Sequence, residues 1–143
     1  MVAVRKLNKL RLCLDPLHLN KGIIRNHYPM PTVEDITPML TKAKVFSVVD
    51  VKDGFLQVVL DEPSSHLTTF WTPFGRYRWL RMPFGIKFAP EEFQRRLDEC
   101  LEGLENISVN HDDIVIFGSS ETREEATASH DVAFKVLLER CRE

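Results

Sequence analysis

The sequence predicts an α+β fold, in which antiparallel strands alternate with inserted helices. An apolar hairpin surrounding the acidic pair Asp112–Asp113 is the first observation behind this prediction. The second is a stripe of apolar residues at helical spacing after Ala89, at Phe93, Leu97, Leu101 and Leu104. The chain has 143 residues, of which 43% are hydrophobic and 28% are charged, and this suffices for one domain with a hydrophobic core.

Short strands and loops are expected in the N-terminal half. Apolar residues alternate over residues 1–14, which predicts two strands joined near Asn8, and proline and glycine punctuate a loop over residues 15–31. Thr32 is expected to cap a short helix that Pro38 ends or kinks. A largely buried strand over residues 45–50 and a second over 55–60 are expected to flank a turn at Asp53–Gly54.

The C-terminal half carries the clearer signals. Two further short strands are expected near residues 67–71 and 77–80. A helix should begin at Ala89–Pro90, because proline suits the first helical position and two glutamates follow it. Residues 107–109 and 114–117 should form the hairpin around the acidic pair, and Ser119 or Ser120 should cap a last helix.

Composition excludes several classes of protein. No apolar run approaches the roughly 20 residues of a membrane span, and the N-terminus lacks the apolar region of a secretory signal. We therefore expect no membrane partner and no secretion. Three widely spaced cysteines, Cys13, Cys100 and Cys141, fit neither a zinc site nor a disulfide framework. They favour a reduced intracellular protein, cytoplasmic or nuclear.

Charge is unevenly distributed. Residues 1–27 hold six Lys or Arg against one acid, whereas residues 98–143 hold four against twelve acids. A basic N-terminal end suits either a phosphate-facing surface or an ordinary solvated one, and charge alone leaves both interpretations open.

Three carboxylates stand out from apolar surroundings. Asp50 ends a strand of valine and phenylalanine, and Asp112–Asp113 occupies the tip of the hairpin. A charge inside an apolar sheet is costly unless it is paired or binds a metal, and a divalent cation relieves the repulsion between adjacent carboxylates. Hard cations held by carboxylates recur in phosphoryl and nucleotidyl transfer. A polar turn and a strand-ending residue explain the same pattern, and spacing alone leaves both interpretations open.

The sequence around these carboxylates strongly resembles the reverse transcriptase of gypsy-type LTR retrotransposons, a part of their Pol polyprotein. The resemblance runs in one register over essentially the whole chain. It rests on the segments RLCLDPLHLNKGIIRNHYPMPTVEDI, KVFSVVDVKDGFLQVVLDEPSSHLTTFWTPFGRYRWLRMPFGIKFAPEEFQRRLDECLEGL and VNHDDIVIFG.

The resemblance implies a right-handed polymerase palm with partial fingers, in which an antiparallel sheet packs on helices. Fingers-like parts are expected over about 1–44 and 61–89, and palm-like parts over about 45–60 and 90–143. The implied activity is an RNA-directed DNA polymerase that adds dNTP to a primer 3′-hydroxyl on an RNA or DNA template. The implied chemistry is two-metal nucleotidyl transfer with Mg²⁺ or Mn²⁺.

The resemblance also assigns the catalytic carboxylates. Asp50 falls on the family's first catalytic aspartate, and Asp112 and Asp113 fall on the acidic pair of the YxDD-type motif. Asp50 and Asp112 would be the main metal ligands, Asp113 would assist, and the backbone carbonyl of Val51 would complete one metal shell.

Five further residues fall on the family's nucleotide-binding positions: Lys6, Arg11, Phe55, Phe84 and Gly85. Arg11 and Lys6 would grip the triphosphate, and Phe55 would select dNTP over rNTP by excluding a 2′-hydroxyl. From the residues alone, Phe55 also fits a core position, and the two cations also fit an exposed strand face. The missing glycine near Asn8 indicates a shortened fingers hairpin, which puts the role of Lys6 in doubt.

Nucleic-acid binding is assigned to two groups. Arg76, Arg78 and Arg81 alternate with aromatic residues and could contact the template, although an ordinary amphipathic strand has the same pattern. Asn110 and His111 depart from the usual residues of the YxDD-type motif. His111 would lie beside the primer terminus, and metal ligation by its ring is the less favoured alternative.

The resemblance leads us to expect a truncated retroelement copy, because the family's primer-grip hairpin, thumb, RNase H domain and integrase have no counterpart in these residues. The alternative function is a catalytically inactive nucleic-acid-binding remnant or a domesticated retroelement fragment.

Overall fold

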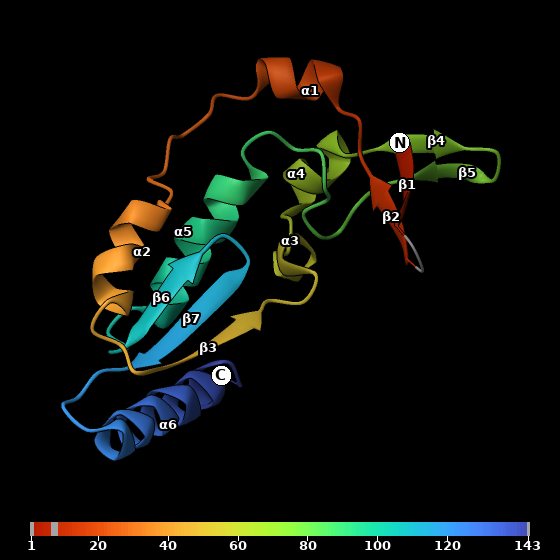
Figure 1. The fold of residues 1–143 in the computed structure, drawn as a ribbon. Helices are drawn as coiled ribbons and strands as arrows, with labels where there is room; N and C mark the ends of the chain where they lie inside the picture. Colours follow the sequence, from red (N-terminus) through yellow and green to blue (C-terminus); the bar gives the residue numbers. More distant parts are fainter. Residues whose placement is uncertain (1, 7–8, 143) are drawn as a thin grey trace. The chain divides into compact units, whose positions relative to one another are not determined.

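The structure is a computed structural model that describes residues 2–6 and 9–142, with the side chains of residues 6, 9–11 and 33 outside the description (Figure 1). Strands and helices alternate along the chain. The elements are β1 (Val2–Lys6), β2 (Lys9–Cys13), α1 (Leu17–Gly22), α2 (Val33–Leu40), β3 (Val45–Asp50), α3 (Gly54–Gln57), α4 (Glu62–Leu67), β4 (Phe70–Thr72), β5 (Gly75–Tyr77), α5 (Ala89–Leu101), β6 (Ile107–Asn110), β7 (Asp113–Gly118) and α6 (Arg123–Arg140).

Contacts divide the chain into two interleaved units. Unit 1 comprises residues 1–27 and 53–93, and unit 2 comprises residues 28–52 and 94–143. Each unit is therefore built from two separate stretches of sequence. Over residues 2–6 and 9–142, no helix combines the length and the apolar character needed to span a membrane.

Unit 2 is built on a three-stranded antiparallel sheet with the order β3-β7-β6. In the register, Ser47 lies opposite Ile116 and Val49 opposite Ile114, so these side chains share one face of the sheet. This face is closed by helices. The other face, which we call the open face, carries Phe46, Val48, Asp50, Ser108, Asn110, Asp113, Val115 and Phe117.

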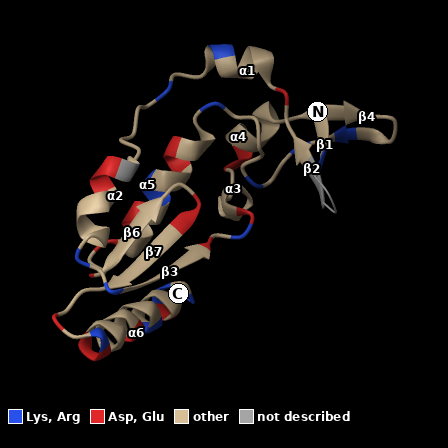
Figure 2. Ribbon diagram, viewed as in Figure 1, with Lys and Arg blue, Asp and Glu red and all other residues tan. Residues whose placement is uncertain are grey.

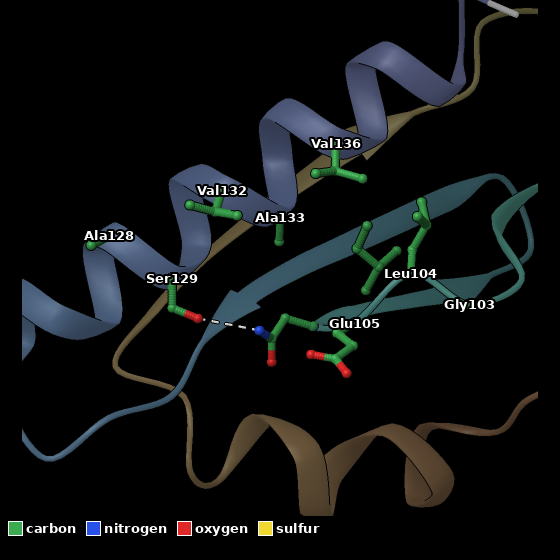
Figure 3. A pocket seen from close by; sticks show the side chains of 10 residues that line it. Gly103, Leu104, Glu105, Ala128, Ser129, Val132, Ala133 and Val136 are labelled. Carbon is green, nitrogen blue, oxygen red and sulfur yellow. Dashed lines mark hydrogen bonds between the residues drawn. The ribbon is translucent and has the colours of Figure 1, made fainter.

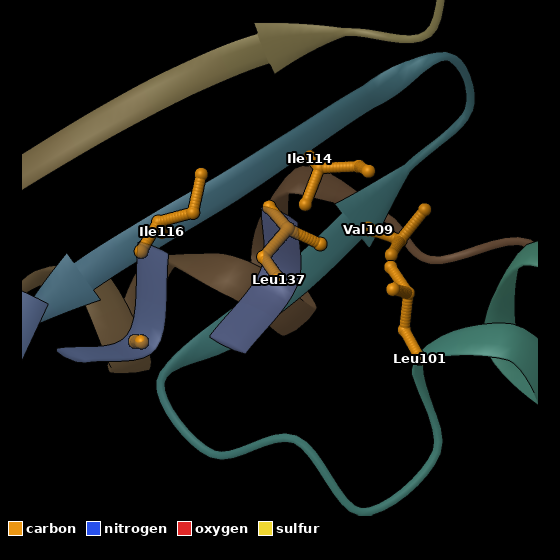
Figure 4. Packing of buried hydrophobic residues seen from close by; sticks show 6 residues of the cluster. Leu101, Val109, Ile114, Ile116 and Leu137 are labelled. Carbon is orange, nitrogen blue, oxygen red and sulfur yellow. The ribbon is translucent and has the colours of Figure 1, made fainter. Parts of the chain in front are cut away.

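The closed face forms the core of unit 2 (Figure 4). Its buried members come from α5, β6, β7 and α6, and they are Leu101, Val109, Ile114, Ile116, Ala133 and Leu137. A polar contact joins the same layers, because the ring of His130 on α6 lies with Nε2 3.0 Å from the Ser47 hydroxyl. The core thus fixes α6 against β3 and β7.

A hollow opens between α6 and the segment that leads into β6 (Figure 3). Its volume is about 490 Å³, and Leu104, Val132 and Val136 supply apolar walls. At its edge Asn106, whose φ is 61°, donates from Nδ2 to the Ser129 hydroxyl over 3.2 Å. This bond ties the start of β6 to α6.

Unit 1 contains two antiparallel hairpins, β1-β2 and β4-β5. Buried polar groups join α4 to the segment after β5, since the Ser65 hydroxyl donates to the Trp79 carbonyl over 2.5 Å. The first turn of α5 is held from the loop after α1. Arg25 Nε donates to the carboxylate of Glu91 over 2.8 Å, and the Glu91 side chain is only 7% exposed.

The helix over α5 and the hairpin β6-β7 confirm the predictions made for residues 89–117. The strand expected over residues 55–60 is wrong: Asp53 takes a left-handed φ of 54°, and the short helix α3 follows it. Of the two strands expected near residues 67–71 and 77–80, the first is β4 and begins only at Phe70, because α4 continues to Leu67, and the second is β5 and ends at Tyr77. The last helix is capped by the Thr122 hydroxyl, which accepts from Glu125 N, and not by Ser119 or Ser120.

Helix α2 also differs from expectation at one point. Thr32 is its N-cap residue as predicted, and both the backbone N–H and the hydroxyl of Thr32 donate to the Asp35 carboxylate over 2.8 Å. The helix nevertheless continues through Pro38 to Leu40. Proline here does not end the helix at once, although the helix stops within its next turn.

Replacing Gly118 with alanine should destabilise unit 2. A Cβ at this position would lie 1.9 Å from the Ala126 carbonyl oxygen, so α6 must move off β7. We expect Gly118→Ala to lower the free energy of unfolding by about 1–3 kcal/mol, the usual range for overpacking. Urea denaturation measures this, and Gly22→Ala is the control because an added Cβ there meets no atom within 4 Å. Equal stability of the two variants would contradict the packing of α6.

The Arg25–Glu91 pair should make stability depend on acid. The hydrogen bond from Arg25 lowers the pKa of Glu91. The pair therefore contributes fully to the free energy of unfolding above the ordinary glutamate pKa, and this contribution is lost as pH falls through the lowered pKa. Urea unfolding of Arg25→Met should show a stability deficit at neutral pH that shrinks toward pH 3. Lys21→Met, at an exposed residue of α1, should show no such trend. A deficit in Arg25→Met that stays constant with pH would argue against the pair.

Candidate functional site

The sheet register of unit 2 brings the predicted carboxylates to one end. Asp50, the last residue of β3, lies directly opposite Asp113, the first residue of β7. Figure 2 shows acidic residues, in red, at these ends of the two strands. Asp113 in turn lies opposite Asn110 at the end of β6. Directly opposed residues of antiparallel strands point to the same face with Cβ atoms about 5 Å apart. Asp50 and Asp113 therefore share the open face.

Asp112 belongs to the tight turn that joins β6 to β7. We call residues Asn110–Asp113 the acidic turn. Its backbone is held to the end of β3, because Val51 N donates to the Asp112 carbonyl over 2.8 Å. The four residues predicted as metal ligands, Asp50, Val51, Asp112 and Asp113, thus meet at one edge of unit 2.

The acidic turn contains backbone strain at His111. Its φ is 59°, in the left-handed region that costs a residue with a side chain on the order of 1–2 kcal/mol. The exposed ring of His111 places Nδ1 2.7 Å from Asn110 Oδ1, so the side chains of the two motif residues assigned to nucleic-acid binding contact each other. His111 N donates to the side chain of Gln94 on α5 over 3.1 Å. The strained conformation is therefore anchored from the helix.

The three carboxylates are exposed, so the expectation that they are charges inside an apolar sheet is wrong. β3 is not largely buried: its residues alternate between half-buried and exposed, and Asp50 is exposed, as are Asp112 and Asp113. Burial therefore does not force these groups to take a partner. The repulsion between carboxylates at one edge remains, and it is the stronger argument.

The donor set has the chemistry of a hard-cation site. Three carboxylates and a backbone carbonyl supply only oxygen ligands, which Mg²⁺ and Mn²⁺ prefer. Over the described part of the chain, however, no group of three or more His, Cys, Asp or Glu is clustered closely enough to hold a metal ion. The residues therefore fit a divalent cation in the kind of donor atom that they supply, and the register places Asp50 and Asp113 at the same end of the sheet.

Unit 1 gathers the aromatic residues predicted to bind the nucleotide. The ring of half-buried Phe55 lies 5.2 Å from the ring of Phe84 and 5.7 Å from that of Phe93, measured between centroids. Phe55 and Phe84 therefore form one cluster. Phe93, the first residue of the predicted apolar stripe, is only 5% exposed and therefore lies in the core.

Gly85 is required by close packing of the backbone. Its φ is 107°, and a Cβ there would lie 1.9 Å from the Leu14 carbonyl oxygen. Asn20 holds the same segment from α1, because its Nδ2 donates to the Gly85 carbonyl and its Oδ1 accepts from Lys87 N, each over 2.9 Å. A structural reason for the glycine thus exists beside the predicted nucleotide contact.

Two of the three predicted template arginines share a hollow of about 360 Å³ in unit 1, lined by His66, Thr69, Arg76, Tyr77 and Arg78. The Arg76 guanidinium lies 5.1 Å from the centre of the Trp71 ring, and Arg78 Nη1 lies 2.6 Å from His66 Nε2. Arg81 instead donates to the Gln57 carbonyl over 2.9 Å.

Lys6 and Arg11 lie on the paired strands β1 and β2, but their side chains lie outside the described residues. Two further polar residues hold the backbone of predicted site residues, one in each unit. They are Gln94, behind the acidic turn, and Asn20, beside Gly85. The available signal for Gln94 was a polar residue next to Phe93 on the apolar stripe of a helix, where an unpaired amide is costly.

The sequence matches the family of reverse transcriptases (RNA-dependent DNA polymerases) over residues 1–143. It is 40% identical over 115 residues to the retrovirus-related Pol polyprotein from transposon 412 of Drosophila melanogaster, covering 79% of this chain and 9% of that protein. It is 37% identical over 120 residues to the enzymatic polyprotein of figwort mosaic virus (strain DxS), covering 83% of this chain and 18% of that protein. The chain thus spans less than a fifth of the length of these relatives.

Solved structures agree with this relationship. A foamy viral protease-reverse transcriptase in complex with double-stranded DNA matches with a TM-score of 0.77 and 28% identity, covering 96% of this chain and 24% of that one. The same viral enzyme in complex with an RNA/DNA hybrid matches with a TM-score of 0.75 and 28% identity, covering 96% of this chain and 18% of that one. The family match over the whole chain and these structural similarities lead to one conclusion. The chain belongs to the reverse transcriptase family and forms a partial palm and fingers region.

Proposed function

We propose that this chain is the nucleotidyl-transfer core of an RNA-directed DNA polymerase that adds dNTP to a primer 3′-hydroxyl. The observation that carries the proposal is the register that pairs Asp50 with Asp113 beside Asp112. Three exposed carboxylates, from two strands and the turn between β6 and β7, lie at the same end of one sheet. Membership of the reverse transcriptase family supports the same reaction.

In this proposal unit 2 is the palm and unit 1 the fingers, so the boundaries follow the units, after residues 27, 52 and 93, and not the boundaries expected at about 44, 60 and 89. Asp50 and Asp112 would be the main ligands of two divalent cations, Mg²⁺ or Mn²⁺, with Asp113 and the Val51 carbonyl completing the set. When bound, these cations supply positive charge that activates the primer hydroxyl and neutralises the triphosphate and the leaving pyrophosphate. The protein's own contribution is to hold the carboxylates at one end of a hydrogen-bonded sheet.

The nucleotide would be bound by residues of unit 1. The rings of Phe55 and Phe84 form a continuous apolar surface, and an aromatic ring at Phe55 would exclude a ribose 2′-hydroxyl by its volume. Gly85, the next residue after Phe84, has no side chain, so its exposed backbone is accessible to the nucleotide in this proposal. Arg11 and Lys6 would meet the triphosphate, since cations on neighbouring strands suit a polyanion.

Template and primer would contact two places. Arg76 and Arg78 line a hollow with Tyr77 and His66, a combination that suits phosphate groups and stacking bases, and Arg81 adds a third cation to the proposed surface. Asn110 and His111 would lie at the primer terminus. Complexes of the foamy viral enzyme with double-stranded DNA and with an RNA/DNA hybrid support nucleic acid as the partner.

Primer extension tests the proposed chemistry. With Mn²⁺ or Mg²⁺, dNTP and a primer–template, the chain should extend the primer, and Asp50→Asn or Asp112→Asn should reduce extension to background because each removes a charged ligand. Glu102→Gln, which removes an exposed negative charge from the same unit, should retain extension. Extension that survives both aspartate substitutions would refute the assigned carboxylates.

Salt dependence tests the proposed template surface. The affinity for a primer–template should fall steeply with salt, and Arg76→Gln or Arg78→Gln should reduce the slope of log K against log salt by roughly 1 for each phosphate that the variant no longer neutralises. Arg123→Gln, at an exposed residue of α6 in unit 2, is the matched control and should leave the slope unchanged. Fluorescence anisotropy measures both quantities. An unaltered slope in the two variants would remove Arg76 and Arg78 from the surface.

A further inference from the structure

A buried glutamine ties helix α5 to the acidic turn. The Gln94 side chain is fully buried, with 0% exposure, and its Oε1 accepts a hydrogen bond from His111 N over 3.1 Å. A buried amide is costly unless both of its ends are satisfied. The hydrogen bond to His111 is therefore stable only if the amide nitrogen of Gln94 also has a partner.

That partner is the half-buried carboxylate of Asp98 in the same unit. Gln94 Nε2 donates to Asp98 Oδ1 over 2.9 Å, and Asp98 Oδ2 accepts from the Tyr28 hydroxyl over 2.9 Å. The carboxylate accepts only, so it fixes which end of the Gln94 amide faces it. The oxygen of Gln94 is consequently directed at the turn. The hydrogen bond to Asp98 also raises the pKa of Tyr28, which keeps the hydroxyl a donor.

The tie acts on the strained residue of the turn. His111 has a φ of 59°, and the two aspartates follow it directly. The direction of the His111 peptide sets the backbone from which the Asp112 and Asp113 side chains leave. Without the hydrogen bond at His111 N, this peptide could rotate toward a less strained conformation.

We propose that Gln94, oriented by Asp98 and Tyr28, is the positioning residue that fixes the acidic turn and so directs Asp112 and Asp113 toward a bound cation. The cation part rests on the proposed function. The tie itself rests on the three hydrogen bonds alone. A glutamine that merely fills space in the core would influence unit 2 as a whole, whereas a positioning residue influences the turn selectively.

Amide hydrogen exchange of the ¹⁵N-labelled chain separates these roles. In Gln94→Met, which keeps the shape but has no acceptor, exchange at His111 N should rise at least about tenfold relative to exchange at Ile116 N in the sheet centre. The affinity for Mn²⁺, measured by electron paramagnetic resonance, should fall about tenfold, the typical effect of losing a residue that orients metal ligands. Tyr28→Phe, which removes only the outer bond, should shift both readouts in the same direction by less.

A double variant that exchanges the amide and the carboxylate of Gln94 and Asp98, and a control variant elsewhere in unit 2, test the hydrogen-bonded chain directly. Gln94→Glu alone places two carboxylates side by side, but combined with Asp98→Asn it restores an acceptor for His111 N, a donor between the two side chains and an acceptor for Tyr28. The double variant should recover both the exchange ratio and the Mn²⁺ affinity. Ser129→Ala is the matched control: it removes a side-chain hydrogen bond to Asn106, the left-handed residue at the other end of β6, and should change neither readout.

Three results would overturn the proposal. Equal acceleration of His111 and Ile116 in Gln94→Met would show a general packing role. Faster exchange at His111 with unchanged Mn²⁺ affinity would show that the tie does not position the carboxylates. A wild-type chain that binds Mn²⁺ no better than Asp50→Asn would overturn the proposed function and the positioning role together, and this result is distinct from the other two.

Discussion

The antiparallel register between β3 and β7 is the constraint on which the site depends. It sets Asp50 opposite Asp113 and leaves both on the open face, while Ile114 and Ile116 enter the core. A slip of one residue would turn Asp50 toward the apolar core, where an unpaired charge is very costly. Close packing of Gly118 under α6 and the bond from Lys44 N to the Gly118 carbonyl, at 3.0 Å, hold the other end of the pair.

The acidic turn adds a second constraint, because register alone does not orient a turn. Val51 N holds it from β3 and Gln94 holds it from α5. The strained His111 is thus held by α5 directly, and the residue after it, Asp112, is held by β3. Backbone strain often occurs at functional positions that the surrounding structure holds in this way. The exposed Phe46 and Val48 on the open face make no comparable hydrogen bonds, because β3, which carries them, is held by the packing of its other face.

Local patterns predicted the elements whose signals lie within a short stretch of sequence. The stripe after Ala89 and the hairpin around Asp112–Asp113 have strong periodicity, and both are confirmed. The strand after Gly54 was wrong, because its apolar residues fit either a strand or a short helix and only the left-handed Asp53 decides between them. The contact of Gln94 with His111 was not predicted for a different reason: His111 lies on another element, and single-sequence periodicity carries no information about contacts between elements.

The interleaving of the two units has a consequence for how the chain folds. Residues 51–112 lie between the paired ends of β3 and β7, and they include a large part of unit 1. During synthesis β3 has to wait until β7 has left the ribosome, so the sheet closes only after a long loop has been ordered at an entropic cost. Unit 1 likewise needs both of its stretches. Neither unit can be produced alone by cutting the gene at one point, and a circular permutant that begins within residues 53–93 would change the order in which the two units become complete.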